Sequence, residues 1–372
     1  MKSILLTSTA LVAFAGAAFA ESHEMLPVPM ADGTPMASAA PMIEPTPANG
    51  VVIGADGSFG YNEEVENGFY FDGGLMVTTS AGMTVAATFG LNVVENDLGE
   101  TVSTSGWALS LTAGDASLSV GEVDPVAEAN WSGVDGATTA DFNDFDAHTA
   151  AGFEAVIAGQ ASMGGFTGMI SYGVNTDGPE DPLDAMQLYV SGDVGAFGMQ
   201  AAYQEEFGGA DAIFAVGAST SSMGADVQVS YVDDGTESSL GVAAAYPFGP
   251  VTVSGYYSFN DVAENNWGVA ADYSDGPVTV NVGYDYDGTT EEGSAAIDAS
   301  YDLGNGVSVL AGYDLGGVDT DGDETYYVAA EADLGGGATF LVSYAADEDD
   351  LTANDDIDDY LEGTTVEVGF SF

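Results

Sequence analysis

Of the 372 residues, 60 are Asp or Glu and only one is Lys or Arg, which gives a formal net charge of -59. So little positive charge excludes a nucleic-acid-binding protein, because phosphate neutralisation needs Lys and Arg, and it excludes a fold held by Lys or Arg salt bridges. The chain is nevertheless 46% hydrophobic, with 51 Gly and only 16% charged residues, below the roughly 25% of soluble domains. A wholly disordered acidic chain and an ordinary soluble globule are therefore both poor fits. The absence of Cys excludes disulfides and thiolate metal sites.

The chain opens with a stretch that predicts a cleaved secretory signal peptide, residues 1–20. Lys2 precedes an apolar run, and Ala18-Phe19-Ala20 forms a small-x-small cleavage signal. A membrane anchor is the alternative reading, but the apolar run is short for a bilayer and polar chain follows it. Cleavage removes Lys2, so we expect a mature chain with no Lys or Arg.

Residues 21–50 predict a flexible tether rich in Pro, Met and Ala. They show neither a strand nor a helix period, and six of the 12 Pro and four of the 12 Met lie here. The four Met side chains and His23 could also form a soft-metal site, since thioethers suit Cu(I). A plain linker accounts for the same composition.

Residues 51–372 predict antiparallel strands, because apolar and polar residues alternate and no long helical stripe occurs. One face of each segment is uncharged, while the other is mostly small, polar or acidic. The best-defined segments are 251–259, 278–286, 297–303, 307–313, 338–344 and 366–372.

The connections between these segments alternate in length. Tight Gly-containing turns, such as Gly304-Asn305-Gly306, join one end of the hairpins. Longer acidic segments join the other end, at 95–103, 123–150, 175–183, 260–266, 316–323 and 347–363. Short turns at one rim and long loops at the other predict an all-β, antiparallel transmembrane β-barrel, whereas a soluble sandwich mixes its connections.

Aromatic residues favour the barrel further, because they collect at strand ends, where amphipathic rings sit at a membrane interface. They are Tyr256, Tyr257, Phe259, Trp267, Tyr284, Tyr286, Tyr313, Tyr326, Tyr327 and Tyr344.

Two stretches carry a resemblance to a known family. Residues 116–124, before a long loop, and the final strand that ends on Phe372 resemble the general porins of Gram-negative bacteria, especially the alphaproteobacterial branch. The resemblance implies an outer-membrane location, a homotrimer, a third loop (124–150) folded into the barrel, and an assembly signal in the last strand, formed by Val366, Val368, Phe370 and Phe372. That family has 16 strands and this chain shows about 20 segments, so 16 to 20 strands remain open.

A porin of this kind is a water-filled channel for passive diffusion of ions and small hydrophilic solutes. We expect constriction-loop carboxylates at Asp124, Glu128, Asp135, Asp141, Asp144 and Asp146. Pore-wall candidates, each of which could instead be a solvated rim charge, are Asp226, Asp272, Asp285, Asp298, Asp302, Glu331, Asp333 and Glu367. The resembling family opposes its acidic loop with arginines, and this chain has none, which predicts cation selectivity.

The acidic outer loops are expected to attract divalent cations, although no cofactor is required. A weak Ca²⁺ candidate places oxygen ligands around a Gly turn at Asp319, Asp321, Asp323 and Glu324, without a complete EF-hand spacing. Solvated acidic loops are the alternative. Since no base is available to meet lipopolysaccharide phosphates, we expect divalent cations to bridge the outer rim to outer-membrane lipid and lipopolysaccharide.

An enzyme is not expected. His148 lies near Asp144 and Asp146, but no nucleophile motif or zinc-binding His pair accompanies it. The competing function is a secreted, acidic, calcium-binding all-β surface or adhesion protein, whose apolar strand faces would form a soluble core.

Overall fold

The computed structural model describes residues 49–63, 68–81, 85–96, 99–134, 143, 145, 155–174, 183–207, 210–315, 324–347, 360 and 362–372. The expected signal peptide and nearly all of the tether therefore lie outside the described residues.

The fold is almost entirely β. Its strands are β1 (Asn49–Asn62), β2 (Phe69–Ala81), β3 (Val85–Asn96), β4 (Gly99–Ala113), β5 (Ala116–Gly121), β6 (Ala155–Met163), β7 (Phe166–Val174), β8 (Leu183–Val194), β9 (Phe197–Gln204), β10 (Ile213–Ser222), β11 (Ala225–Asp233), β12 (Ser238–Phe248), β13 (Val251–Asn260), β14 (Asn266–Asp275), β15 (Val278–Asp287), β16 (Glu292–Gly304), β17 (Val307–Leu315), β18 (Glu324–Gly335), β19 (Ala338–Asp347) and β20 (Gly363–Ser371). A five-residue helix, α2 (Val126–Asn130), interrupts them.

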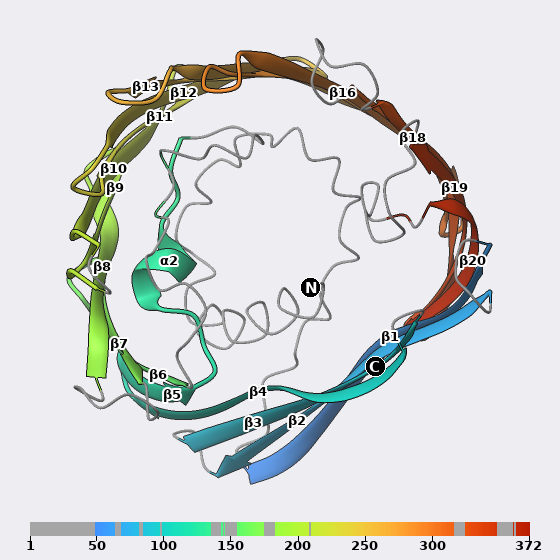
Figure 1. Ribbon diagram of the computed structural model, residues 1–372, viewed down its shortest axis with the longest axis horizontal. Helices are drawn as coiled ribbons and strands as arrows, with labels where there is room; N and C mark the ends of the chain where they lie inside the picture. Colours follow the sequence, from blue (N-terminus) through green and yellow to red (C-terminus); the bar gives the residue numbers. More distant parts are fainter. Residues whose placement is uncertain are drawn as a thin grey trace.

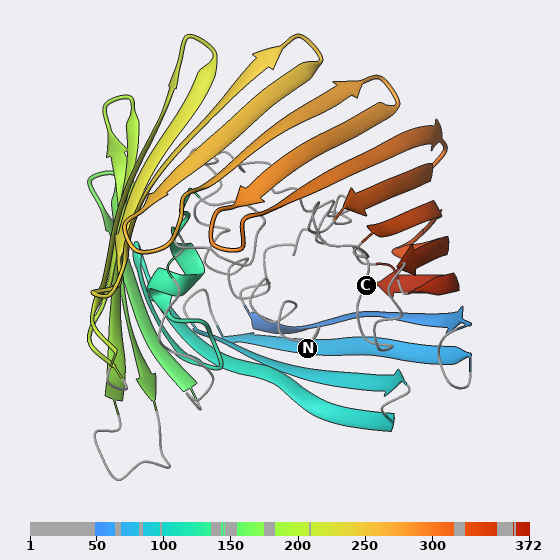
Figure 2. The same cartoon turned by 45° about the horizontal axis from the view of Figure 1, so that its top comes forward.

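The strands form one closed antiparallel sheet of 20 strands. Each strand pairs with the next in the chain, and β20 pairs with β1 to close the ring. Figure 1 shows the ring from one end, with α2 inside it, and Figure 2 shows the same strands tilted, so that the long hairpins of β10 to β17 come forward. The all-β barrel predicted from the alternation is confirmed, and the strand number is 20.

The tight turns follow the expected glycines. Gly304 and Gly306 have φ of 80° and 76° between β16 and β17, a conformation that side chains with a Cβ rarely adopt. One expected loop is wrong: residues 95–96 belong to β3 and 99–103 to β4, which leaves only 97–98 between the strands. Thr101 and Val102 are β-branched, and polar and apolar residues alternate here, so the stretch extends the hairpin despite its polar character.

Side chains sort strictly between two faces of the sheet. The outer face carries exposed apolar residues such as Phe59, Val269, Ile297 and Val328. Many of the expected interface aromatics, including Tyr257, Phe259, Tyr313, Tyr326 and Tyr344, are exposed on the same face. Because side chains alternate along a strand, their neighbours face the interior.

Two of the expected interface aromatics belong to the interior instead. Tyr256 is 8% exposed and Tyr327 is 3% exposed. Each is followed or preceded by another Tyr, and a strand can direct only one member of such a pair to the outer face. Among the described residues, no helix has the length and apolar character needed to cross a membrane.

Candidate functional site

The segment after β5 folds into the barrel and lies against the inner wall. Proline 125 ends the extended chain and opens α2, whose Val126 and Ala127 are buried. Together with Trp131 and Phe145 they pack on inward side chains of β8 to β11, among them Tyr189, Ala202, Ile213, Ala215 and Val232. In Figure 1 α2 lies inside the ring beside β8, as the apolar contacts require. The expected in-folded third loop is thus present.

The first turn of α2 has no capping side chain of its own, and the wall supplies one. Gln187 Oε1 accepts hydrogen bonds from the backbone N–H groups of Ala127 (2.7 Å) and Glu128 (3.2 Å). Ser171 Oγ accepts the N–H of Val126 at 3.0 Å. Helix N-termini leave such donors unpaired, so these inward side chains fix where the helix begins.

The chain after α2 is held by neutral donors on three further strands. Gln200 Nε2 donates to Ser132 O at 2.6 Å, and Gln228 Nε2 donates to the same oxygen at 3.0 Å. Ser258 Oγ on β13 donates to Val134 O at 2.8 Å. The loop backbone is therefore bonded to the wall over β9, β11 and β13.

Asn143 connects the two sides of the loop to the wall. Its Oδ1 accepts from Val134 N at 2.6 Å and from the Ser230 hydroxyl, and its Nδ2 donates to Ser239 O and Oγ at 3.3 and 3.2 Å. Trp131 Nε1 donates to Asn143 O at 3.1 Å. Asn143 is fully buried, so each of these bonds replaces one that water cannot provide.

The glutamines are concentrated beneath this loop. The chain has five, at 160, 187, 200, 204 and 228, all within β6 to β11. Gln187 also donates to Gln204 Oε1 at 2.9 Å, so four of the five belong to the network that seats the loop. Sequence reasoning missed these residues; the available signal was a rare amide recurring on the inward face of successive strands.

Two of the six expected loop carboxylates are described, and both side chains are exposed to solvent. They are Asp124 and Glu128. The surrounding protein partly withdraws the Asp124 carboxyl from water, which raises the pKa of Asp124 above its ordinary value. Asp135, Asp141, Asp144 and Asp146, as well as His148, lie outside the described residues.

All eight expected wall carboxylates occupy inward positions, alternating with outward neighbours. Asp285 is only 6% exposed, while Asp226, Asp272, Asp298, Glu331 and Glu367 are half-buried. Asp302 and Asp333 stand beside tight turns and accept the N–H of Gly304 and Gly335, both at 2.7 Å. These last two carboxylates therefore shape the rim of short turns.

Three of the inward carboxylates accept a hydrogen bond from a tyrosine that the sequence did not identify as a partner. Tyr256 donates to Asp285 at 2.8 Å and Tyr327 donates to Asp298 at 2.7 Å. Tyr70 makes the third bond, to Glu367. In Figure 1 the strands β16, β18, β19 and β20 lie on the other side of the ring from α2, and we call this side the opposite wall. Asp298 and Glu367 belong to it, whereas Tyr256, the partner of Asp285, packs against Val134 of the third loop.

The final strand completes the ring. Val366 and Val368 face outward, and the Phe370 and Phe372 rings stack with centroids 6.3 Å apart. Phe372 follows β20, yet its N–H and C=O exchange 2.8 Å bonds with Ala55 of β1. The terminal aromatic thus extends the closure between the first and last strands.

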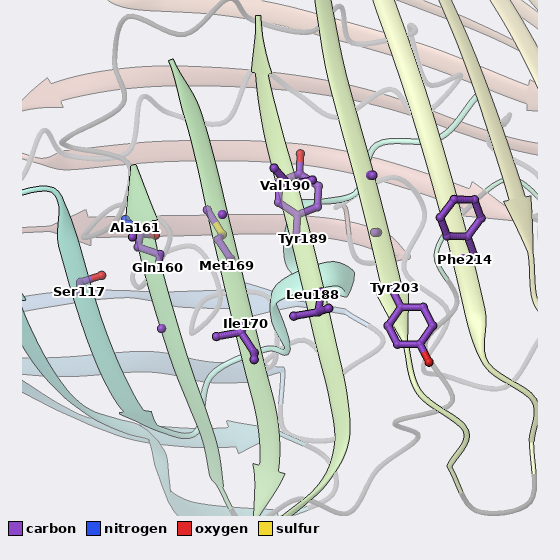
Figure 3. A pocket seen from close by; sticks show the side chains of 14 residues that line it. Ser117, Gln160, Ala161, Met169, Ile170, Leu188, Tyr189, Val190, Tyr203 and Phe214 are labelled. Carbon is purple, nitrogen blue, oxygen red and sulfur yellow. The ribbon is translucent and has the colours of Figure 1, made fainter. Parts of the chain in front are cut away.

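A hollow of about 620 Å³ crosses β5 to β10 on the outer face. Figure 3 shows its exposed apolar lining, which includes Ile170, Leu188, Val190 and Phe214, the face opposite the residues that pack on α2. Small residues on neighbouring strands, Gly159, Ala161, Gly168 and Ala201, make the depression. It belongs to the apolar outer surface and not to the interior.

The described residues contain no group of three or more acidic or His side chains arranged around a metal position. Of the expected calcium ligands, Glu324 begins β18, and Asp319, Asp321 and Asp323 lie outside the described residues.

The comparison with protein families agrees with this architecture. Residues 7–319 match the model of the family described as Gram-negative porin. Among solved structures, the chain is similar to a triple mutant of Rhodopseudomonas blastica porin (15% identity, TM-score 0.38) and to another Rh. blastica porin mutant (16% identity, TM-score 0.39). Each alignment covers 87% of this chain and 100% of the other. No curated protein matches the chain.

Proposed function

Because the chain belongs to the Gram-negative porin family, whose members form outer-membrane channels, we propose that it is a passive pore with a preference for cations. The observation that carries this proposal is the charge of the interior: every wall residue named above that is charged at neutral pH is a carboxylate, and the chain beyond Lys2 has no Lys or Arg. A pore with fixed charge of one sign attracts the opposite ions and repels like ions.

Ions and small hydrophilic solutes are the proposed cargo. A ring of 20 strands is wide enough to enclose an aqueous channel, and the seated third loop narrows it on one side. We propose no catalytic role. The competing reading, a secreted calcium-binding adhesion protein, loses its support because the chain belongs to a family of membrane channels.

Assembly and partners complete the proposal. We infer that the final strand, with Val366, Val368, Phe370 and Phe372, is the outer-membrane assembly signal, and that the barrel forms a homotrimer after export by its signal peptide. Divalent cations would bridge the acidic outer loops to lipopolysaccharide phosphates, since the chain offers no base for them. Removing divalent cations with a chelator should then release lipopolysaccharide from the purified protein without unfolding the barrel.

Planar bilayers with a potassium chloride gradient test the selectivity. The purified protein should add stepwise conductance, and the reversal potential should have the sign of a potassium-preferring pore. Equal permeability for potassium and chloride would refute the cation preference while leaving the channel itself intact. Liposome swelling with uncharged sugars checks diffusion of neutral solutes independently.

A further inference from the structure

Three inward carboxylates are bound in the same way by a tyrosine two strands away. The phenol hydroxyl donates to one carboxylate oxygen in each case: Tyr256 on β13 to Asp285 Oδ1 on β15 (2.8 Å), Tyr327 on β18 to Asp298 Oδ1 on β16 (2.7 Å), and Tyr70 on β2 to Glu367 Oε2 on β20. The donor and the acceptor never lie on adjacent strands, so each bond crosses a complete strand.

A glycine on the intervening strand makes every crossing possible. Gly268 is in direct register with both Tyr256 and Asp285, Gly312 with Asp298 and Tyr327, and Gly60 with Tyr70 and Glu367. A Cβ at any of these glycines would overlap the phenol ring. Since neighbouring strands lie about 4.8 Å apart, a tyrosine can reach a carboxylate two strands away only by lying flat over a residue without a side chain.

The tyrosines are themselves held in place. Tyr256 packs in a buried cluster with Val134 of the third loop and Ala243 of β12. The Tyr327 ring lies 4.8 Å from the ring of Tyr360, and both are at most 5% exposed. The Tyr256 and Tyr327 phenols are therefore donors at fixed positions.

A carboxylate that is partly removed from water needs hydrogen-bond donors to stay ionised, and most proteins provide Lys or Arg. Here the phenol is the available substitute. It adds no positive charge, and one phenol bond occupies only part of a carboxylate's acceptor capacity, so the remaining lone pairs can meet a passing hydrated cation.

We propose that Tyr70, Tyr256 and Tyr327 are positioning residues of the pore, which hold Glu367, Asp285 and Asp298 as ionised, lumen-facing acceptors and thereby set its preference for cations. This inference rests on the proposed cation-selective channel. It gives the barrel a neutral counterpart to a basic cluster: the carboxylates are fixed in place without their charge being cancelled.

The test compares two sets of substitutions and their combination by reversal potential at neutral pH. The first set is Tyr70→Phe, Tyr256→Phe and Tyr327→Phe, which keeps each ring over its glycine and removes only the hydroxyl. The second is Glu367→Gln, Asp285→Asn and Asp298→Asn. Tyr61→Phe, Tyr257→Phe and Tyr326→Phe are the matched control, because these three tyrosines are exposed on the outer face.

Neutralising the three carboxylates should lower the potassium-to-chloride permeability ratio. Removing the three hydroxyls should lower the same ratio by at least about half as much, since an ionised acceptor depends on its donor. The control set should leave the ratio unchanged. On the neutralised background, removal of the three hydroxyls should have no further effect, an outcome that a merely structural role of the tyrosines would not produce.

The two proposals fail in different ways. If neutralising the carboxylates changes selectivity while removing the hydroxyls does not, the positioning role is wrong and the cation-selective pore stands. If the unmodified channel shows no cation preference, the proposed function itself is wrong. Should the triple tyrosine variant not insert, the pair Tyr327→Phe and Asp298→Asn, with Tyr326→Phe as control, gives the same cycle at one site.

Discussion

The wall beneath the third loop and the wall opposite α2 each bind their polar partners with different side chains. Beneath the loop, amides and hydroxyls of β7 to β13 bond the loop backbone, as Gln187 does at the start of α2. On the opposite wall, phenols bond carboxylates, as Tyr327 does with Asp298. An amide can both donate and accept, which suits a backbone that presents N–H and C=O groups, whereas a carboxylate needs only a donor. In this chain, which has no Lys or Arg beyond Lys2, amides therefore bond the loop backbone and phenols bond the wall carboxylates.

The largest effect is expected from removing the amide that connects the loop to its wall. Asn143→Ala leaves Val134 N–H and the Ser230 and Ser239 groups without their partner. Each buried polar group left unpaired costs about 1–3 kcal/mol, so the loop should detach and the single-channel conductance should rise. Ser258→Ala, which removes one bond to Val134 O, should act in the same direction and less strongly.

Asn281→Ala is the control for this experiment, because its amide bonds Asp272 of the neighbouring strand β14 and not the third loop. Its conductance should change far less than that of Asn143→Ala. If the Asn143→Ala and Asn281→Ala channels have the same conductance, Asn143 does not hold the third loop against the wall.

A smaller effect is expected at the glycines over which the tyrosine rings lie. Gly312→Ala and Gly268→Ala place a methyl group where the phenol and the carboxylate lie. Overpacking of this kind costs about 1–3 kcal/mol, so the temperature at which the folded gel band converts to the unfolded one should fall. Gly168→Ala is the matched control on the outer face of β7, where no atom lies within 4 Å of the added Cβ. Equal conversion temperatures for all three variants would contradict the close contact of the tyrosine rings with Gly268 and Gly312.

The smallest effect concerns the carboxylate at the start of the loop. Burial raises the pKa of Asp124, so its ionised form is disfavoured in the folded protein relative to the unfolded chain. This unfavourable contribution to stability is present above the raised pKa and disappears as pH falls through that value towards the ordinary one. Asp124→Asn should remove the Asp124 contribution to the pH dependence and slightly raise the conversion temperature at neutral pH. A variant that is less stable at neutral pH would show that the carboxylate is bonded rather than strained by burial.

Alternation along the strands was sufficient to predict the barrel and the faces of its carboxylates. Asp285 and Asp298 could be assigned to the interior because apolar residues flank them at alternate positions. The partners of these carboxylates could not be predicted. Alternation indicates that Tyr256 faces inward and Tyr257 outward, but which residue lies two strands away from Tyr256 depends on a register that only the paired strands define.

The loop network was hidden for a similar reason. Gln187 and Ala127 are 60 residues apart, and nothing local to either indicates that they meet. An inward Gln recurs on β8, β9 and β11, but this pattern alone does not indicate which backbone groups the amides bond. The polar stretch 99–103 misled in the opposite direction, because Thr and Ser were taken as loop residues where they extend β4.

The central claim is that the pore carries fixed charge of one sign, held by neutral donors, and the pH dependence of the reversal potential tests it most directly. Carboxylates near pKa 4 lose their charge on acidification, and no Lys or Arg is left to replace it, so the cation preference should decline to almost none at about pH 3 without changing sign. The measurement is best made with His148→Gln, which removes the one loop imidazole that would become positive. A reversal to clear anion preference at low pH, or no cation preference at neutral pH, would contradict the account.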